Sequence, residues 1–189
     1  MTYDIILAGV GGQGVLSIAT IIARAAMLDG LTVRQSEVHG MSQRGGGVQA
    51  HLRISDGTIN SDLVPLGNAD MILAMEPMES LRYLSYLKKG GILVTAAEPF
   101  VNIGDYPDPE TLYAAIRKLP GSRIVKAADL AKEAGHAKSV NMVLIGAALS
   151  ALPVTHDSVA KSVHDTFAKK DPRLVDINMK ALELGGNAS

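Results

Sequence analysis

The sequence predicts an α/β fold: a mixed, mostly parallel sheet with helices on both faces and a helical C-terminal third. Three observations support this prediction. Near the N-terminus an apolar run, a glycine-rich turn, an amphipathic segment and a second apolar run follow one another, as in a parallel strand–helix–strand unit. Residues 48–54 then alternate between apolar and polar side chains, the pattern of a half-buried strand. From Ser139 onward the apolar spacing is helical.

The composition is that of an ordinary globular protein. The 189 residues are 47% hydrophobic and 20% charged, and the formal net charge is −1. We expect one domain, residues 1–189, which would bury roughly 70% of the surface of the unfolded chain. There is no stripe of lysine and arginine, and only 4% of the residues are aromatic, so we expect no nucleic-acid partner.

The first elements form a Rossmann-like start. Residues 4–8 are predicted to be a buried strand, residues 15–28 a helix and residues 32–38 a second strand. Gly30 suits the position that follows a helix C-terminus. The apolar positions expected to face the core from the helix are Leu16, Ala19, Ile22, Ala23, Ala26 and Met27.

A β-hairpin insertion is predicted next. Asp56 and Gly57 follow the alternating strand 48–54 and form a hairpin signal, so residues 58–60 are expected to return as its partner strand. A hairpin inside a strand–helix–strand series makes the sheet mixed.

The middle of the chain continues the alternation of strands and helices. Residues 71–75 are predicted as a buried strand, and Glu76 and Pro77 as the start of a helix that runs to about residue 87 and is closed by the Lys-Lys-Gly-Gly run 88–91. The remaining predictions are strands at 92–96 and 123–126, helices at 110–119 and 129–134, and a loop at 99–109.

The C-terminal third contains an unusual helix. Residues 140–152 are apolar almost all round, and a helix without a polar face must be covered on all sides. In a domain this small, a partner subunit could supply part of that cover. Two further helices are predicted to begin after Thr155 and at Asp171 and Pro172.

The chain contains no cysteine. It therefore cannot form a disulfide, a thiolate nucleophile, a cysteine-type zinc site or a cysteine-ligated iron–sulfur cluster. The five histidines lack metal-ligand spacing, so no metal site is predicted. No positively charged segment precedes the first apolar run, and the run 140–152 is too short to cross a bilayer, so we expect a cytoplasmic protein without a membrane partner.

The first glycine-rich turn satisfies the spacing Gly9-x-Gly11-x-x-Gly14 between a strand and a helix. Glu37 follows the last glycine at about the distance of a ribose-binding acid, which makes an NAD site one interpretation. The additional Gly12 and the polar Gln13 weaken it. A phosphate or another cofactor close to the turn, and close packing of helix on strand, are the other interpretations.

The second glycine-rich stretch combines mixed polar chemistry with glycines. An arginine between glycines could bind carboxylate or phosphate through bidentate hydrogen bonds, although a surface loop with incidental charges has the same composition. Asn141 interrupts the apolar helix and is either an internally satisfied amide or a ligand contact. The candidate residues of this stretch are Ser36, Glu37, His39, Ser42, Gln43, Arg44, Gly45 and Gly46.

Both stretches together resemble the gamma-type domain of the 2-oxoacid:ferredoxin oxidoreductases (the pyruvate/ketoisovalerate oxidoreductase gamma type). Among these, the chain is most similar to the small, beta subunits of the indolepyruvate enzymes. The resemblance is carried by residues 9–15 and 36–46, continues through 138–142 with Gly146 and Ala147, and extends to 178–185, so it covers nearly the whole chain.

The resemblance implies CoA-dependent oxidative decarboxylation of a 2-oxoacid, expected here to be an arylpyruvate, to an acyl-CoA, CO2 and reduced ferredoxin. It implies thiamine diphosphate, Mg²⁺ and iron–sulfur clusters. The chain has no cysteine and no Gly-Asp-Gly motif with a following Asn-Asn, and Gly104-Asp105-Tyr106 is not that motif. We therefore expect these cofactors on a large alpha subunit, with two copies of each chain in the complex and no activity of this chain alone; the isolated chain could form a homodimer.

The resemblance also groups the candidate residues. Glu37, His39 and Arg44 would support catalysis at the partner's active site. A stand-alone NAD-binding oxidoreductase and a non-catalytic scaffold subunit remain the alternatives. The residues expected to face a cofactor or coenzyme A are Gly9, Gly11, Gly12, Gln13, Gly14, Ser36, Ser42, Gln43, Gly45, Gly46 and Asn141.

Overall fold

The computed structural model describes residues 1–39, 45–101, 103–168 and 171–188. Among them the strands are β1 (Thr2–Val10), β2 (Thr32–His39), β3 (Gly47–Ser55), β4 (Ala69–Ala74), β5 (Leu87–Ala96) and β6 (Arg123–Val125). The α-helices are α1 (Val15–Leu28), α2 (Pro77–Arg82), α3 (Pro109–Arg117), α4 (Ala127–Ala134), α5 (Val140–Ala148), α6 (His156–Phe167) and α7 (Pro172–Asn187). Short 3₁₀ turns are η1 (Leu84–Tyr86), η2 (Ala137–Ser139) and η3 (Leu149–Ala151).

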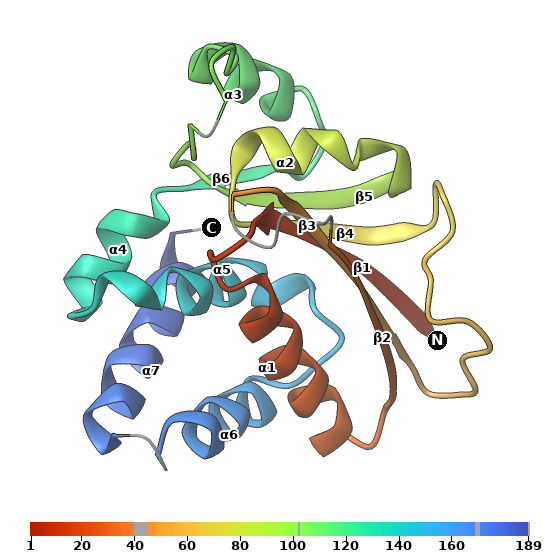
Figure 1. Ribbon diagram of the computed structural model, residues 1–189. Coiled ribbons are helices and arrows are strands. Elements are labelled where there is room, and N and C mark those ends of the chain that lie inside the picture. The colour runs from red at the N-terminus through yellow and green to blue at the C-terminus, as the bar shows by residue number, and fades with distance from the viewer. Residues whose placement is uncertain (40–44, 102, 169–170, 189) are drawn as a thin grey trace.

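The strands form one mixed sheet in the order β2-β3-β1-β4-β5-β6. β3 is antiparallel to both of its neighbours, and β1, β4, β5 and β6 pair in parallel. Helices cover both faces: α1 and α4–α7 lie on one side, and α2 and α3 on the other (Figure 1). The predicted fold class is therefore confirmed, including the helical C-terminal third.

Alternation along β1 divides the core into two layers. Ile5 and Leu7 belong to the large cluster with α1 and α4–α7, whereas Ile6 and Ala8 belong to the smaller cluster with Ile116 of α3. All four β1 side chains are fully buried, because both faces of the sheet are covered.

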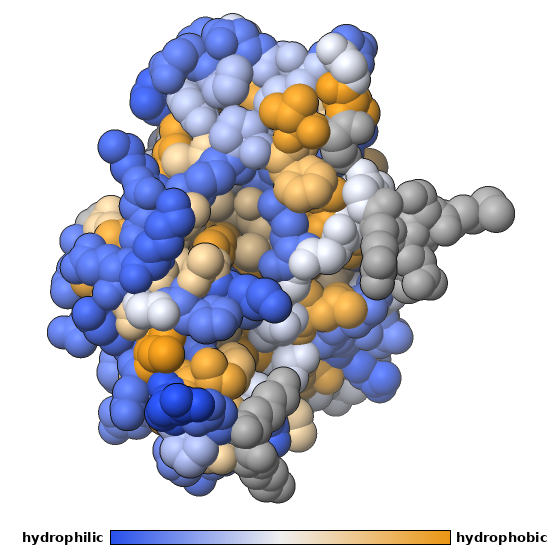
Figure 2. Space-filling view, turned by 60° about the vertical axis from the view of Figure 1, so that its left-hand side comes forward, coloured by the Kyte–Doolittle hydropathy of each residue, from blue (hydrophilic) through white to orange (hydrophobic). Residues whose placement is uncertain are grey.

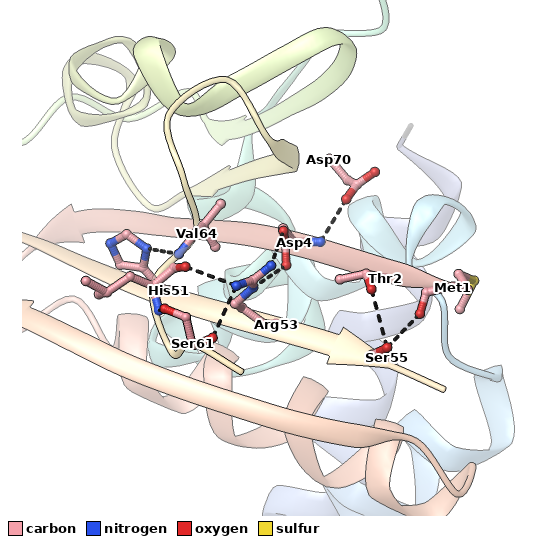
Figure 3. Close-up of polar contacts among 10 residues, drawn as sticks. Met1, Thr2, Asp4, His51, Arg53, Ser55, Ser61, Val64 and Asp70 are labelled. Carbon is pink, nitrogen blue, oxygen red and sulfur yellow. Dashed lines mark hydrogen bonds and ion pairs between the residues drawn. The ribbon is translucent and has the colours of Figure 1, made fainter. Parts of the chain in front are cut away.

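The predicted hairpin partner was wrong. β3 pairs with β2 and β1, and residues 58–60 form no strand. Arg53 explains the arrangement, because its side chain donates hydrogen bonds to the carbonyl oxygens of Ser61 (3.2 Å) and Leu63 (3.1 Å) and so holds this segment as a loop. His51 accepts a hydrogen bond from the Val64 amide at 3.0 Å, and Figure 3 shows both side chains directed at the loop. The hairpin in this sheet is β2–β3, which the second glycine-rich stretch connects.

A buried ion pair fixes β1 against β3. Arg53 contacts Asp4 through two parallel hydrogen bonds of 2.8 and 3.0 Å (Figure 3), and their side chains are 15% and 7% exposed. The two residues are directly opposite in the register of the strands. The Asp4 amide also donates to Asp70 at 2.8 Å, which extends the contact to the start of β4.

The predicted helix from residue 77 to 87 is too long. α2 ends at Arg82, and β5 begins at Leu87. In the pairing of β4 with β5, Ala69 is opposite Leu87 and Met71 is opposite Ile92, so the residues between Leu87 and Ile92 bulge out of the ladder. The Lys-Lys-Gly-Gly run that resembled a helix C-terminus is this bulge.

The apolar helix α5 is covered by its own chain. Its residues from Met142 to Ala148 are buried, with α7 as the main neighbour. The two helices approach closely because Gly146 of α5 faces the Leu182 backbone and Gly185 of α7 faces the Val143 backbone. No partner subunit is needed to cover it. In α1, by contrast, Leu16 and Met27, predicted to face the core, are 42% and 65% exposed.

Candidate functional site

The first glycine turn connects the end of β1 to α1. Gly12 and Gly14 have φ angles of 102° and 94°, which other residues rarely adopt. Gln13 closes the turn from inside: its side-chain oxygen accepts from the Val10 amide at 2.7 Å, and its side-chain nitrogen donates to the Met75 carbonyl at 3.4 Å. Gln13 therefore ties the turn to the end of β4.

Gly9 is required by packing. A Cβ atom at this position would lie 2.8 Å from Cγ2 of Val15 and 3.0 Å from Cβ of Met75. Both neighbours belong to the core. Gly9 thus lets α1 approach the sheet and has no open space beside it for a ligand.

The two glycine-rich stretches are hydrogen-bonded to each other. The Gly11 amide donates to the Gly46 carbonyl at 2.8 Å, and the Gly45 amide donates to the Gly11 carbonyl at 3.4 Å. This reciprocal pair extends the pairing of β1 with β3 beyond the strands. It places the described end of the second stretch beside the first turn.

Several predicted site residues cannot be placed. Ser42, Gln43 and Arg44 lie outside the described residues. His39 is the last residue of β2, and only its backbone is described.

The described β2 residues lie on one side of the first turn. Ser36 is half-buried, and Glu37 is exposed and accepts a hydrogen bond from the Gln35 side chain at 3.0 Å. Glu37 borders a hollow of about 390 Å³, which we call the strand-side hollow. The described residues that line it are Val10, Gly11, Gly12, Gly14, Val15, Leu16, Glu37 and Val48.

Asn141 lies on the other side of the turn. Its side-chain oxygen accepts from the Met142 amide at 3.0 Å. Its side-chain nitrogen lies 3.9 Å from the point where a Cβ of Gly14 would be. A second hollow of about 520 Å³, the cleft-side hollow, is bordered by the turn, by Lys138 and Asn141, and by Glu98 and Phe100 after β5. The glycine turn therefore separates two hollows.

Two buried glutamates near this edge were not predicted as site residues. Glu76 is 0% exposed and links three segments: it accepts from the Glu79 amide (2.7 Å), the Phe100 amide (3.3 Å) and the Tyr106 hydroxyl. Burial and the bond to Glu76 raise the pKa of Tyr106, which keeps the phenol neutral as the donor. Glu76 thereby fixes the loop beside the cleft-side hollow.

Glu79 lies against the start of β3. Its carboxylate pairs with Arg82 at 3.1 Å, and a Cβ at Gly47 would lie 2.9 Å from one of its oxygens. Burial raises the pKa of Glu79, Arg82 opposes this shift, and the charge of Glu76 adds to it. In the sequence the two glutamates match the acidic start of any helix, so only their observed contacts identify their place.

The sheet order differs from that of a dinucleotide-binding fold. There the second strand is the neighbour of the first, and the acid at its end reaches the ribose beside the glycine turn. Here β3 lies between β1 and β2, which moves Glu37 about 5 Å farther from β1. Gln13 also fills the inside of the turn. Both observations argue against an NAD site.

Other features of the described residues set limits on the site. They contain no group of three or more histidine, aspartate and glutamate side chains that could hold a metal ion. None of the helices traced over the described ranges has the length and apolarity needed to cross a membrane. On the face that Figure 2 shows, hydrophobic residues form separate patches among hydrophilic ones.

Comparisons with known proteins show the family of the chain. Residues 4–188 match the family "pyruvate ferredoxin/flavodoxin oxidoreductase". Indolepyruvate oxidoreductase subunit IorB of Archaeoglobus fulgidus is 38% identical, over 99% of this chain and 95% of the relative, and that of Pyrococcus horikoshii is 39% identical, over 99% and 96%.

A solved structure shares the fold over its whole length. The gamma subunit of keto/oxoacid ferredoxin oxidoreductase from Geobacter sulfurreducens has a TM-score of 0.70 and 27% identity, covering 98% of this chain and 97% of that one. These matches confirm the resemblance found in the glycine-rich stretches. The chain belongs to the pyruvate ferredoxin/flavodoxin oxidoreductase family.

Proposed function

We propose that this chain is the small subunit of a heteromeric 2-oxoacid:ferredoxin oxidoreductase that acts on indolepyruvate or another arylpyruvate. The observation that carries the proposal is the similarity to curated indolepyruvate oxidoreductase subunits over 99% of the chain, at 38% identity. The hydrogen-bonded pair of glycine-rich stretches supports it, because both would then face one shared active site.

The cofactors of such a reaction do not fit this chain. Iron–sulfur clusters need thiolate ligands, and the sequence has no cysteine. Mg²⁺ with thiamine diphosphate needs oxygen ligands, and the described residues offer no cluster of acidic groups. We therefore assign thiamine diphosphate, Mg²⁺ and the clusters to a larger partner subunit, with coenzyme A as co-substrate and ferredoxin as acceptor. In this proposal the chain is inactive alone.

The contribution of this chain would be to bind and orient. The amides of Gly12 and Gly14 make no hydrogen bond to another described residue, so they can donate to an anionic group. Arg44 would hold a substrate carboxylate or a phosphate of coenzyme A through paired hydrogen bonds. Glu37 and His39 would orient neighbouring groups at the mouth of the partner's active site.

Reconstitution with the partner tests the role of Arg44. A charge-assisted hydrogen bond contributes about 1.5–3 kcal/mol, so Arg44→Ala should raise KM for the 2-oxoacid or coenzyme A about 10–100-fold. Arg34→Ala is the matched control, because its side chain is 56% exposed and pairs only weakly, at 3.6 Å, with Asp62. Wild-type kinetic constants in the Arg44 variant would reject the role and favour a scaffold subunit.

Two measurements test the assignment itself. A pull-down with the full chain from its native cell should recover a large, cysteine-rich, thiamine-binding protein. Titration of the isolated chain with NADH should show no binding. Tight NADH binding without such a partner would favour the stand-alone oxidoreductase.

A further inference from the structure

A third hollow of about 500 Å³ lies among the helices, between α1, η2, α5, α7 and the end of α6. We call it the helix-side hollow. It shares Ser17, Lys138 and Asn141 with the cleft-side hollow, but extends away from the sheet edge, toward α7. None of the residues proposed above except Asn141 borders it.

Two almost fully buried polar side chains border this hollow with unused hydrogen-bonding capacity. Ser139 is 2% exposed, and its hydroxyl neither caps α5 nor bonds to any other described residue. Asn178 is 4% exposed; its amide nitrogen donates to the Leu174 carbonyl at 2.7 Å, which leaves its oxygen without a partner among the described residues. Neither oxygen is among the fully enclosed unpaired atoms of the described residues, so a ligand or water in the hollow can reach both.

The other polar groups around the hollow are mainly donors. The Asn141 side-chain nitrogen and the Ser17 hydroxyl each lie 3.9 Å from the position that a Cβ of Gly14 would take. His136 accepts from the Lys138 amide at 3.1 Å through Nδ1, so its neutral ring carries the proton on Nε2. With the lysine ammonium group, these side chains offer many N–H and O–H donors.

The charge around the helix-side hollow is one-sided. The described residues that border it include Lys138 and His136 but no aspartate or glutamate. Ordered water would satisfy single hydroxyl and amide groups. A lysine beside several donors and no acid, however, matches the acceptor-rich oxygens of a phosphate group.

We propose that the helix-side hollow binds the phosphate group of a small phosphorylated molecule. Lys138 supplies the charge, and Ser139, Asn141 and His136 donate hydrogen bonds. Asn178 supplies an acceptor, which suits a hydroxyl or amino group beside the phosphate. This proposal does not depend on turnover or on a partner subunit.

Binding to the full isolated chain tests the proposal. Amide shifts in two-dimensional NMR spectra would be followed during titration with inorganic phosphate, adenosine monophosphate and coenzyme A. We expect residues 136–141 to shift with at least one probe. Lys138→Ala should weaken binding about tenfold or more, and Ser139→Ala about threefold or more. Lys161→Ala should bind as wild type, because that lysine lies on the exposed side of α6 and pairs with Asp165.

The probe that binds most tightly identifies the source of the phosphate. Preference for coenzyme A would make the hollow part of a coenzyme A site, whereas preference for adenosine monophosphate or inorganic phosphate would make it a separate one. Absence of shifts with all three probes would overturn the proposal. So would equal binding by wild type and Lys138→Ala, with unfolding temperatures confirming that both proteins are folded.

Discussion

The crossing of α5 and α7 allows a quantitative test of the fold. A Cβ atom at Gly185 would lie 2.7 Å from the carbonyl carbon of Val143 and 2.9 Å from its Cα, with the carbonyl oxygen closer still. Because carbon atoms pack at about 3.5–4.0 Å, Gly185→Ala is roughly 1 Å too close to a rigid backbone. The helices must separate, which opens the core that α5 shares with α1 and α4.

The expected cost can be worked from two opposing effects. Overpacking of a core costs about 1–3 kcal/mol and occasionally more, and contact with backbone on a fully covered helix favours the upper end. Replacing glycine by alanine inside a helix contributes about 1 kcal/mol in the opposite direction. Gly185→Ala should therefore lower the free energy of unfolding by about 2 kcal/mol or more.

Gly186→Ala is the matched control. It is the next residue of the same helix, and its Cβ would meet only the Gly146 carbonyl oxygen, at 3.8 Å. This variant gains the helix propensity without the overlap, so it should be neutral or up to about 1 kcal/mol more stable.

Urea unfolding followed by circular dichroism would measure both variants. A difference of about 3 kcal/mol between them corresponds to roughly 6–12 °C in unfolding temperature for a chain of this size. If Gly185→Ala unfolds within 0.5 kcal/mol of wild type, a threshold set by the usual effect of surface substitutions, the close crossing is refuted.

Three further predictions concern the sheet. Arg53→Ala leaves the buried Asp4 carboxylate unpaired and should cost about 3–5 kcal/mol in urea unfolding. Burial lowers the pKa of His51, so the unfolded chain binds the proton more readily than the folded chain. Wild type should therefore lose stability as pH falls below about 6.5. His51→Asn should remove that part of the pH dependence of urea unfolding, measured between about pH 5 and 7.5. Gln13→Ala leaves the Val10 amide unpaired and should cost about 1–3 kcal/mol by the same assay.

Local patterns predicted the elements whose sequence signals are themselves local. The helix predicted at residues 15–28 is α1, and the strand at 32–38 lies within β2. The errors concern pairing at a distance. Asp56 and Gly57 look like a hairpin turn, but Arg53 of β3, whose side chain is 15% exposed, holds the following segment as a loop through hydrogen bonds. The local order of residues in a sequence does not reveal a hydrogen bond of this kind.

The cover of α5 shows a similar limit. Its apolar sequence predicted correctly that every face is buried, but not which element buries it. α7 buries α5 because Gly146 and Gly185 let the two helices approach closely. In a sequence, a glycine within a helix is recognised only as a weak helix former. Their role becomes visible only when the two backbones are placed together.

The sequence indicated the candidate residues but not how the glycines among them divide their roles. The sequence marked both glycine-rich stretches, and the structure joins them through Gly11 and Gly46. The glycines of the first stretch, however, have different structural roles. Gly9 is excluded from ligand contact by Val15 and Met75, which fill the space beside it.

The remaining glycines of that turn differ in the hydrogen bonds that their backbones make. Gly11 uses both its amide and its carbonyl in the pairing with the second stretch, whereas the amides of Gly12 and Gly14 have no partner among the described residues. Gly14 also opens α1 without a side-chain cap. Among the glycines of this turn, Gly12 and Gly14 are therefore the ones whose amides can donate to an anion, and a substitution at Gly9 that impairs activity would act through packing.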